Sequence, residues 1–165
     1  MPAEVEIRPD QGSFRAVTRA LEREGNGRRL KADLVDELHD AVGPAVHEVR
    51  GALMVEGGGG LGHAGEPLRA AVAAGISDQT ILTGRAAGVK VIASKTGMPR
   101  GFRNAPKRLN ARGWRHPVFG RRDVVVRQVG APGFFDDTLA AHRERYRRAV
   151  ARAMTKSVNR MERGL

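Results

Sequence analysis

The chain contains no cysteine among its 165 residues. A disulfide framework and a thiolate metal site are therefore both excluded, while the redox compartment is left open. Aromatic residues make up only 4% of the chain, so the core has to be built mainly from alanine, valine and leucine. Such a core suits helix packing better than a thick β-sandwich. The length is typical of a single domain, which we expect to cover residues 1–165.

Long apolar runs are also missing. None approaches the roughly 18 to 20 residues that a membrane-spanning helix needs. The opening segment, MPAEVEIRPD, is acidic and mixed, whereas a signal peptide has a basic start and an apolar middle. We therefore expect a soluble protein that is made in a cytoplasm and has no membrane partner.

Acidic residues are almost absent from one central stretch. Between Arg85 and Arg127, twelve basic residues accompany a single acid, Asp123, so this stretch carries a net charge of +11. The rest of the chain holds 17 basic and 17 acidic residues and is neutral. A positive field concentrated in this way attracts a polyanion or an acidic protein surface.

Apolar residues at steps of three and four predict long helices near both ends of the chain. They indicate a helix over 13–24, a second over 29–55 and a last one from about 134 to 162. Pro44 lies inside the second helix and predicts a kink there. At 1.5 Å per residue this helix would be about 40 Å long, which is more than a small domain needs. We therefore expect part of its apolar face to pack against a neighbouring subunit.

Glycine and β-branched residues divide the middle of the chain. Residues 57–65 form a glycine-rich linker, which lacks the Gly-Lys-Ser/Thr ending of a nucleotide-binding loop. A short alanine-rich helix over 66–74 precedes strands at 76–83 and 89–94, which flank a predicted hairpin turn. Residues 95–122 show no period and are expected to form an extended basic loop, followed by a third strand at 123–129. These elements predict an α+β fold, in which long N- and C-terminal helices pack on a small, mostly antiparallel sheet, with 1–28 as an N-terminal arm and helix.

Catalytic and metal-binding patterns are absent from the sequence. Five histidines occur without an HExxH motif, and no pair has the spacing of a helical zinc site. The adjacent acids Asp36 and Glu37 point apart on a helix, and Asp136 with Asp137 suits the first turn of one. We therefore expect a protein that is not an enzyme and that holds no cofactor and no metal.

The basic segment interleaves its arginines and lysines with Phe102, Trp114 and Phe119. One interpretation is nucleic-acid binding, with arginines on phosphates and aromatic rings stacked on bases. The other is a protein-interaction arm, because arginine and tryptophan are enriched in interface hot spots. Charge alone favours neither, and the spacing fits no zinc finger, RNA-recognition motif or basic zipper.

Two short motifs carry a resemblance to a known family. RHPVFG at 115–120, then the strand VVV at 124–126, then PGFFD at 132–136, resemble the hallmark stretch of the neck or tail-completion (head–tail connector) proteins of long-tailed double-stranded-DNA bacteriophages. The order of elements over roughly 29–160 is also similar, although the glycine run at 57–60 departs from the family.

The resemblance implies a structural virion protein without catalytic residues, located at the head–tail junction and assembled in the host cytoplasm. It implies a homo-oligomeric ring that joins the DNA-filled head to the tail. Its neighbours would be head-completion or connector proteins and tail-tube or tail-terminator proteins, with non-specific contact to packaged DNA. The copy number, a neck or tail-terminator position, and a phage or gene-transfer particle stay open.

Two sets of residues follow as hypotheses. The first set, the basic arm that contacts neighbours, consists of Arg100, Arg103, Lys107, Arg108, Arg112, Trp114, Arg115, Arg121 and Arg122. The second set, for the subunit core or lateral contacts, consists of Leu34, Leu38, Phe135, Leu139 and Tyr146. The alternative function is a free basic nucleic-acid-binding protein, and a toxin-like or nuclease interpretation lacks a catalytic set.

Overall fold

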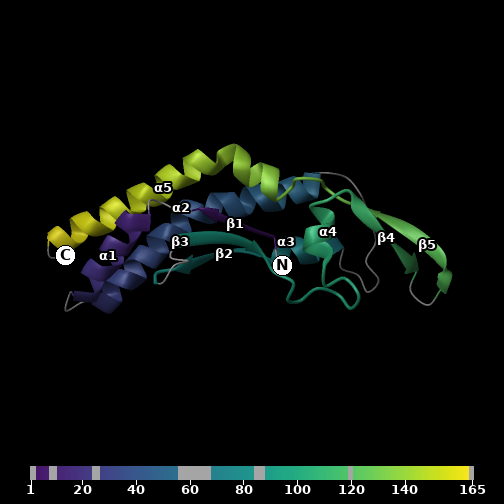
Figure 1. Ribbon diagram of the computed structural model, residues 1–165, viewed down its shortest axis with the longest axis horizontal. Coiled ribbons are helices and arrows are strands. Elements are labelled where there is room, and N and C mark those ends of the chain that lie inside the picture. The colour runs from purple at the N-terminus through teal and green to yellow at the C-terminus, as the bar shows by residue number, and fades with distance from the viewer. Residues whose placement is uncertain are drawn as a thin grey trace. The chain divides into compact units, whose positions relative to one another are not determined.

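The computed structural model describes residues 3–7, 11–23, 27–55, 68–83, 88–118 and 121–163. Its helices and strands are shown in Figure 1. In chain order they are β1 (Ala3–Ile7), α1 (Gln11–Arg23), α2 (Gly27–Val55), α3 (Leu68–Ala74), β2 (Ile76–Ile81), β3 (Gly88–Ala93), α4 (Ala105–Leu109), β4 (Gly113–Val118), β5 (Arg121–Val129) and α5 (Asp136–Glu162). The α+β prediction is confirmed. The predicted glycine-rich linker at 57–65 and the turn at 84–87 lie outside the described residues.

The strands form two sheets rather than the single sheet expected. The first has the order β1-β3-β2, and the second contains β4 and β5. β1 was not predicted, although its sequence, AEVEI, alternates apolar and acidic residues as a half-buried strand does. The expectation of a loop throughout 95–122 was wrong, since this segment contains α4 and β4. α4 is only five residues long, too short to establish a helical period, and arginine, histidine and proline interrupt the apolar pattern of β4.

The contacts within the chain divide it into two compact units. Unit 1 consists of Met1–Glu4, His47–Ser77 and Ile92–Ala141. Unit 2 consists of Val5–Val46, Asp78–Val91 and His142–Leu165. The single domain expected over 1–165 stays a prediction, because α2 and α5 contribute residues to both units. The segment proposed as the basic arm belongs entirely to unit 1.

Unit 2 is built around helices whose apolar faces are buried. Leu34 and Leu38 of α2 and Tyr146 of α5 are almost completely inaccessible to solvent. Charged side chains at the margin of this core link the same two helices. The Nζ atom of Lys156 lies 3.1 Å from Oε1 of Glu37, and Nη2 of Arg160 lies 2.5 Å from the same oxygen. The periodic leucines therefore form a core within the chain, as the spacing indicated.

Most of the apolar face of α2 is buried within the chain. Leu34, Leu38, Val42, Val46, Val49 and Leu53 are all buried, although Pro44 lies within the helix. The expectation that part of this face packs against a neighbouring subunit stays a prediction, and Leu30 is a half-buried residue of the same face. The burial of these residues was predicted by their helical spacing. Exposed apolar side chains on α2 occur at its end, at Met54 and Val55.

No helix in the part of the chain that the structure describes combines the length and the apolar character needed to cross a membrane.

Candidate functional site

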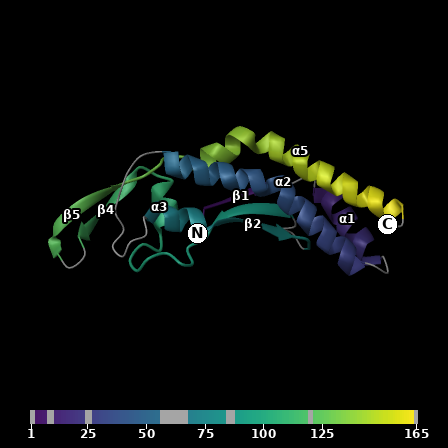
Figure 2. The same cartoon turned by 180° about the vertical axis from the view of Figure 1, so that it is seen from behind.

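An antiparallel two-stranded ribbon forms the candidate functional site. Its strands, β4 and β5, lie side by side and extend away from α3 and α4 within unit 1, as the two opposite views show (Figure 1, Figure 2). The register pairs Gly113 with Val129 and Pro117 with Val125, and a bulge interrupts it beyond Pro117. Residues that face each other across the strands share one face of the ribbon. The ribbon therefore has two faces with different chemistry.

Two glycines close the base of this ribbon. Gly113 has a φ of +96°, a conformation that side-chain-bearing residues rarely adopt. A Cβ atom at Gly113 would overlap the carbonyl oxygen of Gln128, and one at Gly130 would overlap the carbonyl oxygen of Ala111. The two backbones thus approach each other where any side chain would separate them. Glycine at both positions allows the hairpin to begin directly after α4.

One face of the ribbon, which we call the aromatic face, is made by Trp114, His116, Val126 and Gln128. The ring of Phe102 meets it edge-on, 5.3 Å from the His116 ring centroid and 6.2 Å from that of Trp114. The guanidinium carbon of Arg108 lies 5.5 Å from the centroid of Trp114. Phe102, Trp114 and His116 are all partly buried in this cluster. These rings therefore pack on one another against the ribbon.

The opposite face, which we call the open face, is exposed along its whole length. It consists of Arg115, Pro117, Val125, Arg127 and Val129. Val125 and Val129 are 55% and 50% accessible to solvent. Arg115 and Arg127 are directly opposite each other in the register, an arrangement of like charges that destabilises a sheet. Apolar side chains beside two opposed arginines mark a surface that suits a partner better than water.

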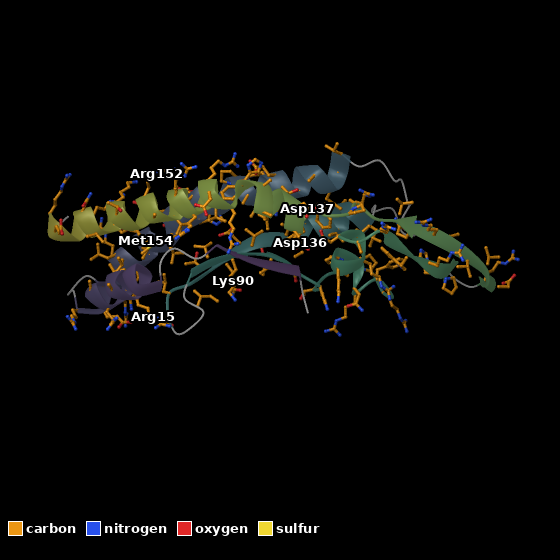
Figure 3. All side chains as sticks on the ribbon, turned by 45° about the horizontal axis from the view of Figure 1, so that its top comes forward. Arg15, Lys90, Asp136, Asp137, Arg152 and Met154 are labelled. Carbon is orange, nitrogen blue, oxygen red and sulfur yellow. The ribbon has the colours of Figure 1, made fainter. Side chains whose placement is uncertain are left out.

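Hydrogen bonds tie the ribbon and the PGFFD motif to α4. The side chain of Asn110 accepts from the backbone N–H of Phe135 at 2.9 Å and donates to Asp136 at 2.5 Å. The backbone N–H of Ala131 donates to the carbonyl of Leu109 at 2.7 Å. Asp136 and Asp137 lie in the first turn of α5 (Figure 3), where the helix dipole favours negative charge. The PGFFD motif is therefore held to the C-terminal end of α4 in unit 1.

A buried arginine holds the base of the ribbon to α2. Arg69 of α3 is only 7% accessible to solvent, and its Nη1 atom donates to the carbonyl of Leu53 at 2.6 Å. Its Nη2 atom donates to the carbonyl of Gly130 at 3.4 Å. The first bond satisfies a carbonyl in the last turn of α2, where no helical partner remains. Arg69 thus positions the strand exit at Gly130 against the end of α2.

The predicted basic-arm residues are distributed around the ribbon rather than along a loop. Arg100, Arg103, Lys107, Arg108 and Arg112 are exposed on α4 and its flanking turns, and Arg115 and Arg121 are exposed on the strands. Arg121 donates to Asp123 at 3.2 Å. Arg108 covers one side of Trp114 and therefore has a packing role. The backbone of Arg122 lies in β5, and its side chain is outside the described residues.

The predicted packing residues are all buried. Leu34, Leu38, Phe135, Leu139 and Tyr146 are each at most 2% accessible. They form core within this chain, so none of them is available for the lateral contacts that were the other option. Phe135 and Leu139 belong to unit 1.

Sequence reasoning missed two features of the surface. The exposed valines of β5 and Arg127 were not among the predicted site residues, although the run DVVVRQV was visible. A second basic surface follows α5 and includes Arg148, Arg152, Lys156, Arg160 and Arg163. Part of its charge is already neutralised, because Lys156 and Arg160 pair with acids of α2. The ribbon therefore remains the stronger candidate.

One histidine in unit 2 has a displaced pKa. The Nδ1 atom of His39 lies 2.8 Å from a carboxylate oxygen of Asp78, whose side chain is 8% exposed. This hydrogen bond, with the charge of Asp78, raises the pKa of His39 above its usual 6.5. The charged pair links α2 to β2.

The described residues contain no cluster of three or more histidine, aspartate or glutamate side chains that could hold a metal ion. Comparison of the chain with protein-family models, curated proteins and solved structures found no match. The ribbon, its opposed arginines and its exposed valines are thus the features from which a function has to be inferred.

Proposed function

We propose that this protein is a structural, non-enzymatic component of the head–tail junction of a long-tailed bacteriophage, where copies form a ring that joins the DNA-filled head to the tail. The observation that carries the proposal is the open face of the β4–β5 ribbon. The resemblance of RHPVFG and PGFFD to phage neck and tail-completion proteins names the assembly. The ribbon provides a contact surface of the kind that such an assembly requires.

The open face supports a protein partner on energetic grounds. Val125 and Val129 are about half exposed, and covering each would contribute on the order of 1 kcal/mol. Arg115 and Arg127 repel each other in the free protein, and a carboxylate placed between them would remove that repulsion. The burial of the two valines and the relief of the repulsion between the two arginines both require a neighbouring protein on the open face. A ring subunit encounters such neighbours on every side, through contacts that join unlike patches.

The alternative is a free nucleic-acid-binding protein. The exposed Arg100, Arg103, Lys107 and Arg112 favour it, because phosphate contacts need charge and little else. The aromatic cluster disfavours it, since Phe102, Trp114 and His116 pack on one another. Exposed valines beside arginines also suit protein contacts better than phosphates.

The proposal is tested by locating the protein in particles. Negative-stain images of phage particles labelled with an antibody to this protein should show label at the head–tail joint. Label absent from particles would overturn the proposal. If the purified protein then bound duplex DNA at physiological salt with a steep salt dependence, the nucleic-acid alternative would replace it.

A substitution experiment separates the basic arm from general charge effects. Arg103, Lys107 and Arg112 are exposed and are not part of the aromatic cluster, so their replacement by glutamate leaves Arg108 on Trp114. We expect phage with this triple variant to accumulate full heads and separate tails. The matched control replaces Arg143, Arg148 and Arg152, which are exposed on α5, and should give joined particles. Normal joining by the arm variant would contradict the role of the arm.

A further inference from the structure

The three central residues of β5 are the apolar run of an interior strand, yet β5 belongs to a ribbon of only two strands. Val124, Val125 and Val126 follow one another, so apolar side chains point to both faces of the strand. Such continuous apolar runs are typical of strands that are covered on both faces. Here the three valines are 37%, 55% and 40% accessible to solvent. β5 therefore presents apolar surface that the described part of the chain does not cover.

The outer edge of β5 is the better of the ribbon's two edges for pairing with another strand. β4 contains Pro117, which has no N–H to donate, and its pairing with β5 is irregular beyond that residue. β5 has nine residues and no proline, and within this sheet it has a strand on one side only. An edge of this length and composition is a template for a further strand.

The charges around β5 specify the strand that it would accept. A strand added beside β5 brings one of its residues next to Arg127 on the open face, with Arg115 one strand further away. A carboxylate at that position pairs with Arg127 and offsets the repulsion that Arg127 experiences from Arg115. A second copy of the same basic segment is disfavoured, because Arg85 to Arg127 contains twelve basic residues and one acid. Apolar side chains of the added strand would lie next to Val124 and Val126, and the contact would bury both sets of side chains.

We propose that the outer edge of β5 takes up an extended acidic strand from a neighbouring protein. The added strand continues the β4–β5 sheet through main-chain hydrogen bonds, with carboxylates on the open face and apolar residues on the aromatic face. This inference rests on the proposed function and deepens it, because it names the chemistry of one contact in the assembly.

The test uses the full-length protein and short synthetic peptides that carry a fluorescent label. A peptide of alternating valine and glutamate should bind, as measured by fluorescence anisotropy. A peptide of alternating valine and lysine should bind at least about tenfold more weakly. A valine–glutamate peptide in which proline replaces alternate valines keeps every glutamate but cannot form a continuous strand, and it should not bind. Hydrogen exchange followed by NMR should show new protection of amides within 121–129 when the first peptide is present.

Charge reversal on the open face provides the specificity control. Arg115 and Arg127 are both exposed, so the double variant Arg115→Glu and Arg127→Glu leaves the aromatic face and the core in place. This variant should bind the valine–lysine peptide more tightly than the valine–glutamate peptide, which is the reverse of the wild-type preference. The matched control, Arg143→Glu with Arg152→Glu on α5, makes the same change in net charge and should keep the wild-type preference.

Each contrary result overturns the proposal. Equal binding of the proline-containing peptide, or binding without protection of 121–129, would show attraction by charge alone. Protection, in the protein without peptide, of the amides of 121–129 that point away from β4, together with dimers in sedimentation, would show that a second copy occupies the edge. Failure of the peptide test leaves the particle-labelling result unaffected, so the two proposals fail separately.

Discussion

Replacing Gly113 by alanine should destabilise the ribbon far more than replacing another glycine of similar backbone conformation. Gly113 and Gly101 have φ values of +96° and +85°, so alanine at either position incurs the cost of a positive φ, about 1 kcal/mol. A Cβ atom at Gly101 would meet nothing within 4 Å. At Gly113 it would overlap the Gln128 carbonyl oxygen and lie 2.7 Å from the backbone nitrogen of Gly130. The two backbones would therefore have to separate.

The magnitude follows from this difference in surroundings. Gly101→Ala should cost about 1 kcal/mol, whereas Gly113→Ala should cost about 3 kcal/mol or more, because overlap between backbone atoms is added to the cost of the φ angle. If the free energy of unfolding falls by about 2 kcal/mol per molar urea, the difference between the two variants corresponds to about 1 M in the urea concentration at the unfolding midpoint.

Trp114 provides the measurement, because it is the only tryptophan and lies next to Gly113 on the ribbon. Urea unfolding followed by tryptophan fluorescence should show the large shift for Gly113→Ala. Far-ultraviolet circular dichroism, which is dominated by the long helices, should show a smaller one. Equal fluorescence midpoints for Gly113→Ala and Gly101→Ala would refute the close approach at the base of the ribbon.

Three other predictions concern the core, the α4 anchor and the histidine pair. Leu38→Ala removes a fully buried side chain and should lower the free energy of unfolding by about 2 to 5 kcal/mol in urea, and a loss below 1 kcal/mol would contradict its burial. Asn110→Ala removes the bonds to Phe135 and Asp136 and should cost about 1 to 2 kcal/mol, with Asn159→Ala on the exposed side of α5 as a near-neutral control. Because Asp78 raises the pKa of His39, the charged pair stabilises the protein below pH 6.5, and this contribution is lost as the pH rises through the raised pKa. The stability difference between wild type and His39→Gln should therefore be larger at about pH 5.5 than at about pH 8.5, and a difference independent of pH would exclude the charged pair.

The long helices could be predicted because their signal is local and repeated. In α2, Leu34, Leu38 and Val42 recur at helical spacing, and their burial follows from that period. The same argument located Leu139 and Tyr146 in α5. The position of the strand pair at 76–93 could also be predicted, since its β-branched runs are short and clearly bounded.

The candidate site could not be predicted because it depends on pairing between distant residues. Trp114, His116 and Pro117 do not give β4 an alternating apolar pattern, so the strand is defined by its partner. Arg115 and Arg127 are separated along the chain, and only the register places them face to face. Likewise, the sequence of α2 does not show which distant helices cover its apolar face. What the sequence did locate was the stretch of excess positive charge in which the site lies.

Arg69 has a mechanical consequence for the ribbon. Its guanidinium group joins the carbonyl of Leu53, near the end of α2, to the carbonyl of Gly130, where the chain leaves β5. A pulling force on β5 therefore reaches α2 by a path much shorter than the intervening chain. One buried side chain thus shares a load between a strand and a helix.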